Sequence, residues 1–206
     1  MKDSKFLPKV LVIALLSLLW TGTALARAEF SFFFGPSIEQ AGNIQDLGKP
    51  EANTGFEFNY FFNENHGLGA SIGNEYDFEG SRNFPAIHDA SIQTWDIHYA
   101  FRFRPQNSIL QFTFTPGFGM QTLYSASADY YWGYFYYNSL STAWVFDYKL
   151  MMDFVLKENK DENGMSRSSV FVGFGINQIF SMNDNYQGRD ISGSRLSGLF
   201  RVGFGF

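Results

Sequence analysis

Three residues that lie close together in the sequence, His88, Asp89 and Ser91, are of the types that build a hydrolytic or acyl-transfer site. In such sites a histidine acts as the base, an acidic residue orients it and a serine attacks as the nucleophile. Side chains of adjacent residues seldom converge on one another, however, and polar loops commonly contain these residue types. We therefore predict that the chain is not an enzyme and keep the three residues as a catalytic alternative.

Signatures of metal, nucleotide and thiol chemistry are missing from the sequence. The chain has no cysteine, and its three histidines, His66, His88 and His98, do not have the spacing of metal ligands. No glycine-rich loop has the pattern that binds phosphate. We expect no metal ion and no cofactor.

A second set of polar residues occupies every other position of the apolar segments. In a strand, such residues lie on one face, here the inner one. The members of this group are Glu57, Glu75, Asp77, Asp96, His98, Arg102, Arg104, Asp147, Lys149, Asp153 and Arg201. Both signs of charge are present, and charges shut away from water require partners. Our main interpretation is an ion-pair network that plugs a narrow lumen. The alternative is a gated pore or a proton path.

The segment ASADYYWGYFYYNSL, residues 126–140, is the least generic part of the chain. Its candidate binding residues are Tyr130, Tyr131, Trp132, Tyr134 and Tyr136. One interpretation is an aromatic girdle at the level of the lipid headgroups, together with strands that extend above the membrane. The other is a surface that binds a saccharide, a peptide or a neighbouring cell, because these rings have apolar faces and polar edges.

Period-two alternation marks the elements that must hold these residues. Apolar residues alternate with small or polar ones in eight segments: 30–39, 55–62, 68–78, 94–104, 110–121, 140–154, 170–181 and 196–206. This pattern is typical of strands with one face toward lipid and the other toward a crowded lumen. We predict an all-β fold, a closed antiparallel transmembrane barrel of eight strands. Ten strands is the alternative, if 125–139 forms a hairpin of its own.

The connections between these segments fall into two classes. Short ones at 63–66, 105–108 and 157–167 alternate with longer, irregular ones at 41–53, 79–91, 125–139 and 183–195. Short periplasmic turns and longer extracellular loops are the outer-membrane arrangement, which places both termini in the periplasm. Pro36 and Pro116 lie inside strands, where a missing N–H is costly, so we expect a β-bulge at each.

The first 28 residues resemble a secretory signal peptide. Lys2, Lys5 and Lys9 precede a short apolar run, and small residues follow it, with cleavage expected after Ala28 and Ala26 as the second choice. Residues 29–206 then form the barrel domain. Removal of residues 1–28 leaves 11 basic and 19 acidic residues, a net charge of −8, which argues against binding of nucleic acid.

The whole mature chain resembles the small eight-stranded outer-membrane barrels of the OmpA, OmpX and opacity-protein type. The resemblance rests on the signal peptide, on the glycine-rich strands TPGFGM (115–120) and VFVGFGI (170–176), and on the closing FRVGFGF (200–206). It implies an outer-membrane location in a Gram-negative bacterium, with lipid and lipopolysaccharide as surroundings. It also implies that Val202, Phe204 and Phe206 form an assembly signal for the barrel-assembly machinery, with periplasmic chaperones as further partners.

These observations leave several functions open. We expect a monomeric barrel with a structural or surface-binding, adhesin-like role, a plugged lumen and an extracellular ligand at the aromatic segment. The alternatives are an enzyme that modifies lipid A, acting through His88, Asp89 and Ser91, and a narrow transport barrel for a small apolar solute. Fold alone does not choose among these roles.

Overall fold

The computed structural model describes residues 27–47, 50, 52–76, 90–106, 108–129, 134–160, 166–186 and 188–206. His88, Asp89, Asp77, Tyr130, Tyr131 and Trp132 lie outside these ranges, as do residues 1–26 of the predicted signal peptide. In the described part of the chain, no helix has the length and apolar character needed to cross a membrane.

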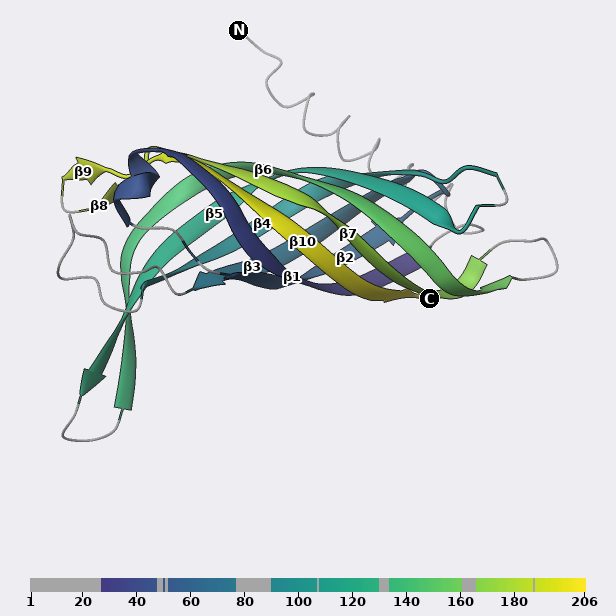
Figure 1. Ribbon diagram of the computed structural model, residues 1–206, viewed down its shortest axis with the longest axis horizontal. Helices are drawn as coiled ribbons and strands as arrows, with labels where there is room; N and C mark the ends of the chain where they lie inside the picture. Colours follow the sequence, from purple (N-terminus) through teal and green to yellow (C-terminus); the bar gives the residue numbers. More distant parts are fainter. Residues whose placement is uncertain are drawn as a thin grey trace, which may run out of the picture.

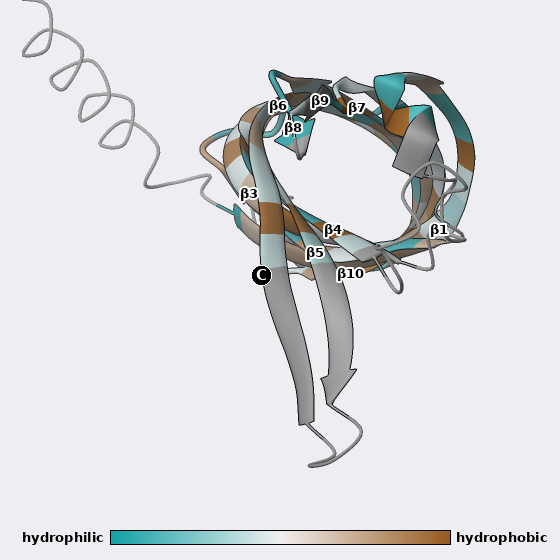
Figure 2. Cartoon of the chain, turned by 90° about the vertical axis from the view of Figure 1, so that its left-hand side faces the viewer, coloured by the Kyte–Doolittle hydropathy of each residue, from teal (hydrophilic) through white to brown (hydrophobic). Residues whose placement is uncertain are grey.

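Eight long antiparallel strands close into a barrel, as predicted (Figures 1 and 2). They are β1 (Arg27–Gly42), β2 (Ala52–Phe61), β3 (His66–Tyr76), β4 (Ala90–Phe103), β5 (Leu110–Asp129), β6 (Tyr134–Lys160), β7 (Ser166–Met182) and β10 (Gly193–Gly205). Each strand pairs with the next barrel strand along the chain, and β10 pairs with β1 to close the ring. Full closure satisfies the backbone without leaving an edge exposed to lipid.

The two faces of the wall differ as the alternation predicts. In β4, Trp95 and Ile97 are 54% and 72% exposed, whereas Asp96 and His98 between them are buried. The same contrast recurs in every barrel strand and produces an outward band of Phe, Leu, Ile and Trp side chains. Such a band is unfavourable in water and is what the hydrocarbon of a bilayer requires.

The β5–β6 connection differs from the expected irregular loop. The two strands stay paired beyond the barrel wall, from Ala126 opposite Tyr137 to Asp129 opposite Tyr134. Figure 1 shows this pair leaving the wall as a hairpin. Aromatic residues favour extended backbone, which explains why the strands continue. Because the hairpin is an extension of β5 and β6, the ten-strand alternative is wrong.

The prediction of a β-bulge at each proline was only partly correct. Beside Pro36, the register of β1 against β10 shifts between Ser37 and Glu39, so Glu39 is exposed although the alternation placed it inside. Pro116 causes no shift and pairs with Tyr148 of β6 in regular register. On its other side the β4–β5 pairs stop at His98 and resume at Phe101. The missing N–H therefore interrupts the pairing of β4 with β5 there, but neither strand contains the extra residue of a bulge.

Both ends of the barrel sequence meet at one rim. The backbone N–H of Ala28 donates to the carbonyl of Phe206 and the N–H of Phe206 donates to the carbonyl of Ala28, each at 2.9 Å. The β2–β3, β4–β5 and β6–β7 connections lie at this same end. This arrangement agrees with the predicted placement of both termini on the side of the short turns.

The opposite rim carries additional structure. A 3-10 helix, η1 (Asn43–Leu47), follows β1, and the short strands β8 (Asn185–Tyr186) and β9 (Arg189–Asp190) form a small hairpin before β10. Asn43 donates a hydrogen bond to Asp190 at 3.1 Å, which joins the two loops. Hydrogen bonds from Ser192 lower the pKa of the Asp190 carboxyl. Ile44 and Ile191 are almost completely buried beneath these loops.

Candidate functional site

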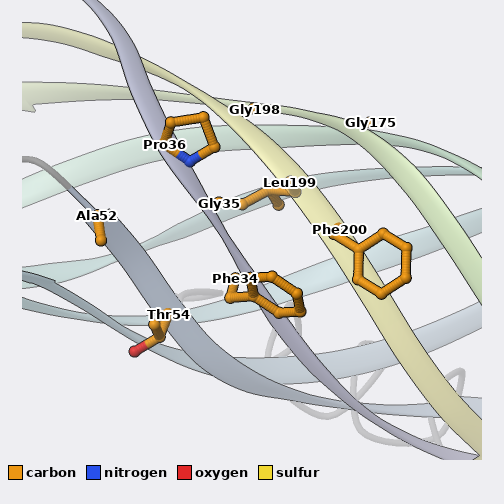
Figure 3. Close-up of a pocket in the computed structure, with 9 residues that line it drawn as sticks. All are labelled: Phe34, Gly35, Pro36, Ala52, Thr54, Gly175, Gly198, Leu199 and Phe200. Carbon is orange, nitrogen blue, oxygen red and sulfur yellow. The ribbon is translucent and has the colours of Figure 1, made fainter.

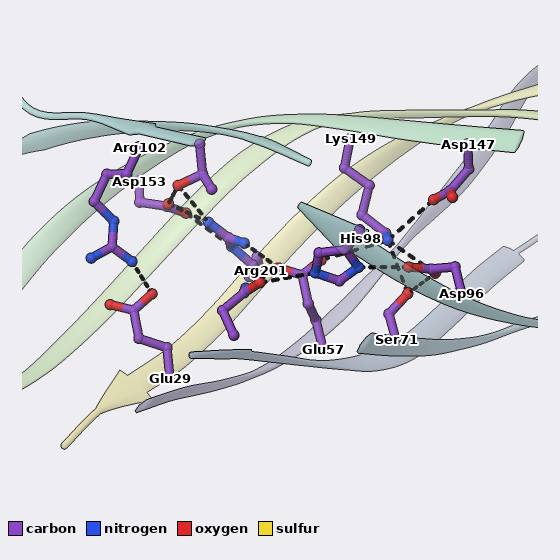
Figure 4. A network of polar contacts seen from close by, with 12 residues as sticks. Glu29, Glu57, Ser71, Asp96, His98, Arg102, Asp147, Lys149, Asp153 and Arg201 are labelled. Atoms are coloured by element: carbon purple, nitrogen blue, oxygen red, sulfur yellow. Dashed lines mark hydrogen bonds and ion pairs between the residues drawn. The ribbon is translucent and has the colours of Figure 1, made fainter. Parts of the chain in front are cut away.

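A network of ion pairs and hydrogen bonds lies inside the barrel (Figure 4). Lys149 of β6 lies at its centre, and its Nζ is 2.9 Å from the Ser71 hydroxyl and 3.3 Å from a carboxylate oxygen of both Asp96 and Asp147. A Glu57 oxygen is 3.6 Å away. These side chains come from β2, β3, β4 and β6, so the ammonium group links strands across the lumen.

Hydrogen bonds from other side chains connect these charges to one another. The two ring nitrogens of His98 lie 2.6 Å from Asp96 and 2.8 Å from the Asn59 side-chain oxygen. The Asn59 amide in turn donates to Glu57 at 2.7 Å. Ser71 donates a further hydrogen bond to Asp96. Buried polar groups are stable only when such partners are present, and this chain of contacts supplies them.

Arg201 forms a second centre next to the first. Its Nη1 is 2.9 Å from Glu57, and its Nε donates to Asp153 at 3.1 Å, with a second bond from Nη2 to the same carboxylate. The guanidinium also lies over the ring of Phe171, 5.3 Å from its centre. A two-point contact of this kind fixes orientation as well as charge. Glu57 therefore joins the Lys149 and Arg201 centres.

A third group lies toward the rim with the chain termini. Arg102 pairs with Glu29, and Glu29 also forms an ion pair with Arg27 at 2.9 Å. The Arg102 guanidinium lies 3.6 Å from the centre of the Phe61 ring, a geometry suited to a cation–π contact. At the opposite end, Arg195 is 2.7 Å from Glu75.

The Arg195 group extends further through hydrogen bonds to neighbouring side chains. Arg195 donates to the Gln121 side-chain oxygen at 2.7 Å, and the Gln121 amide donates to Asp184 at 2.6 Å. All three side chains are buried. This group lies beneath the loops of the rim opposite the termini, so charged contacts extend along most of the lumen.

Most of the predicted lumen residues lie in the barrel interior and have charged partners. Glu57, Glu75, Asp96, Arg102, Asp147, Lys149 and Arg201 are all buried in the barrel interior. Arg104 is different, because it lies beyond the end of β4 and pairs with Glu158 at 2.7 Å in a partly exposed position. Asp77 lies outside the described residues.

Sequence reasoning missed Glu29, Asp184 and Arg195. Glu29 shares its face with Ser31, so continuing the alternation by one step would have found it. Arg195 was assigned to a loop, but β10 begins at Gly193 and places it inside. Asp184 precedes the small β8–β9 hairpin, and no alternation signals its burial.

The lumen also contains apolar side chains, which the sequence pattern did not predict. Phe33, which interrupts the alternation of β1, points inward and packs with Met151 and Leu199. A small cavity lies between Phe33 and the Lys149 centre, with a volume of about 10 Å³, room for about one water molecule. Apolar side chains therefore share the described part of the lumen with the ion network.

The catalytic and aromatic candidates are placed only in part. Ser91 lies in β4 at an outward position, in the same row as Gln93 and Trp95, so it does not face the polar interior. Tyr134 and Tyr136 belong to the β6 side of the hairpin, opposite Asp129 and Ser127. Among the described residues, no three His, Asp or Glu side chains are arranged to hold a metal ion.

No family model matches the sequence, and no curated protein matches it. Among solved structures, Neisserial surface protein A aligns over 87% of this chain and 94% of its own, with 10% identity and a TM-score of 0.53. The N-terminal β-barrel domain of Pseudomonas aeruginosa OprF aligns over 87% and 97%, with 13% identity and a TM-score of 0.49.

A third similar structure is Ail, the attachment invasion locus protein of Yersinia pestis, in complex with the heparin analogue sucrose octasulfate. It aligns over 88% of this chain and 97% of its own, with 16% identity and a TM-score of 0.45. The likeness to the first of these structures confirms the fold of small outer-membrane barrels, which the resemblance in the sequence implied. The likeness agrees with the closed ring of paired strands and with the lipid-facing band, and these observations together identify the fold class. The chain has the fold of a small outer-membrane β-barrel. Its role must be argued from its own residues, because this fold has no single function.

Proposed function

We propose that this barrel is a monomeric surface-binding protein whose lumen is plugged and whose β5–β6 hairpin binds an extracellular ligand. The observation that carries the proposal is the contrast between the two candidate regions. Paired charges occupy the lumen, whereas β5 and β6 continue beyond the wall as a hairpin.

Binding inside the lumen would disrupt contacts that the barrel needs. A ligand would have to displace Lys149 or Arg201 from carboxylates at 2.9–3.6 Å. Leaving a buried charge without its partner costs about 3–5 kcal/mol. The same cost opposes an open pore, so we propose that the barrel conducts no ions. A planar-bilayer recording tests this, and steady single-channel steps would contradict a plugged lumen.

The hairpin carries no such cost. Its sequence, DYYWGYFYYN over residues 129–138, combines aromatic rings with hydroxyl and amide groups. Burying one such ring against a saccharide or peptide contributes about 1–3 kcal/mol, so three or four rings suffice for a specific contact. Rings with two rotatable bonds also lose little conformational freedom on binding.

The test replaces the rings of the hairpin. In one variant Tyr131, Trp132, Tyr134 and Tyr136 become serine, which removes apolar area but retains hydroxyl groups. In the matched control the three tyrosines become phenylalanine, which retains the rings. We expect binding of expressing cells to glycan and peptide arrays to fall by at least tenfold in the serine variant and to persist in the control.

Heat-modifiable gel migration must show that both variants are folded. Failure of the serine variant to insert would indicate that the rings form a membrane girdle, and the binding proposal would be wrong. Unchanged binding by a folded serine variant would also refute it. Equal loss in both variants would indicate that the ligand recognises the hydroxyl groups, against the stacking argument.

A further inference from the structure

An apolar groove lies on the outer wall of the barrel, at the seam where the first and last barrel strands meet (Figure 3). Its volume is about 500 Å³, within the range of sites that hold small ligands. Its lining comes from β1, β2, β7 and β10 and consists of Phe34, Gly35, Pro36, Ala52, Thr54, Gly175, Gly198, Leu199 and Phe200. Thr54 supplies the only side-chain polar atom of this lining.

The groove exists because the seam lacks pairing at this level. Phe34 pairs with Phe200 and Ser37 pairs with Ser197, but the two positions between them make no pair with β10. Pro36 has no N–H to donate, which accounts for the gap. Gly198, at an outward position, places no side chain in it, and a Cβ on Gly35 would overlap the carbonyl oxygen of Gly198.

Leu199 closes the groove toward the inside. It is only 5% exposed and packs with Phe33 and Met151 in the apolar part of the lumen. The floor is therefore apolar, and the paired charges of the lumen do not reach the groove. A polar ligand would find few partners here, whereas a hydrocarbon chain would find an apolar floor and aromatic walls.

The surroundings determine what can occupy the groove. Phe34 and Phe200, at its rim, are 43% and 40% exposed and belong to the lipid-facing band. Ala52 is the first residue of β2 after the long β1–β2 connection, so the groove lies toward the rim opposite the chain termini. In the orientation expected for an outer-membrane barrel, this is the outer leaflet.

We propose that the groove holds an acyl chain of one lipid A molecule. Each buried methylene contributes favourably, and a preformed groove spares the wall the cost of rearrangement. This proposal concerns the wall and is independent of ligand binding by the hairpin. A phospholipid and a second copy of the barrel are the other candidate occupants, and the experiment below distinguishes them.

Gly198 offers a clean way to fill the groove. A Cβ built on Gly198 lies 3.5 Å from Cδ1 of Ile38 and 3.9 Å from Cδ of Pro36, which are ordinary contacts. The variant Gly198→Leu therefore places a side chain in the groove without straining the backbone. Ala70→Leu is the matched control, because Ala70 is an exposed, outward-facing residue of β3 that does not line the groove.

The barrel in detergent is titrated with hexa-acylated lipid A. Native mass spectrometry then measures how much lipid A stays bound to the barrel. We expect one lipid A per barrel, about tenfold weaker retention by Gly198→Leu and unchanged retention by Ala70→Leu. Equal retention by Gly198→Leu would overturn the proposal. Equal retention of dioleoyl phosphatidylethanolamine, or a barrel dimer that Gly198→Leu abolishes, would overturn the assignment to lipid A.

A second measurement needs no variant and remains decisive if Gly198→Leu does not fold. Lipid A with a photoreactive group in one acyl chain is mixed with the wild-type barrel in bilayers, and the cross-linked peptides are identified. We expect cross-links concentrated in 34–36 and 198–200. Cross-links distributed evenly over the lipid-facing positions of all strands would refute a specific groove.

Discussion

Replacing Lys149 by methionine should destabilise the barrel more than any other single change of a lumen cation to an apolar residue. The ammonium group contacts Ser71, Asp96 and Asp147 at 2.9–3.3 Å and has Glu57 at 3.6 Å. All of these side chains are nearly inaccessible to water. Methionine retains most of the volume, so the loss is electrostatic rather than a cavity.

The expected magnitude follows from the burial of the partners. Removing one member of a buried ion pair costs about 3–5 kcal/mol, because the remaining charge stays buried without compensation. Here two carboxylates, Asp96 and Asp147, would face each other without the cation. We expect the free energy of unfolding to fall by about 4 kcal/mol, close to a thousandfold in the equilibrium constant.

The assay is equilibrium unfolding by urea in lipid vesicles, followed by the fluorescence of Trp95 and Trp144 on the lipid-facing wall. Arg104→Met is the matched control, since its pair with Glu158 has side-chain exposures of 27% and 12% and lies beyond the end of β4. A partly exposed pair at the rim contributes less than a buried one, about 1 kcal/mol. Adding Asp147→Asn to Lys149→Met should recover part of the loss. If Lys149→Met costs no more than Arg104→Met, the account of the lumen as an interdependent ion network is wrong.

Three further predictions concern the ends of the chain and its chemistry. The residue pattern at the signal peptide favours cleavage after Ala28 over Ala26, but Arg27 belongs to β1 and pairs with Glu29. We therefore prefer Ala26 and expect mass spectrometry of the mature protein to find cleavage there; a mature chain that starts at residue 29 would contradict this. Deleting Phe206 removes two backbone hydrogen bonds that close the ring, so outer-membrane levels should fall and periplasmic protein should rise, whereas Phe103→Ala should change neither; equal yields would count against an assembly signal. Expression of the wild type should leave the mass spectrum of lipid A unchanged, and a mass shift lost in His88→Ala or Ser91→Ala would establish the catalytic alternative instead.

The barrel could be predicted from the sequence because alternation is a local property. Lipid on one face and a narrow lumen on the other impose period two on every strand, as Trp95, Asp96 and Ile97 illustrate. The expected alternation assumes that inward-facing residues are small or polar, however, and therefore treats Phe33 as a break in the pattern. Phe33 in fact obeys the geometry and departs only from the expected chemistry, because it packs against Met151 and Leu199.

The contacts within the lumen could not be predicted in the same way. Alternation placed Lys149 inside, but its partners Ser71 and Asp96 lie on strands that do not pair with β6. Those contacts depend on strand register and on the shape of the closed ring. A shift of two residues keeps every side chain on its face and changes every partner. Arg195 was missed for a related reason, since the boundary between loop and strand depends on the small β8–β9 hairpin.

The glycines of the barrel wall differ in whether backbone packing requires them. Gly35 and Gly175 admit no side chain, because a Cβ would overlap the carbonyl oxygens of Gly198 and Leu150. Close approach of backbones therefore explains why they are glycine. Gly198 has room for a Cβ, and its position faces the lipid, where a larger apolar side chain would bury more area and favour the strand. Packing within the barrel gives no reason for glycine there. An occupied groove gives one, because any larger residue at 198 would take the volume that the acyl chain fills.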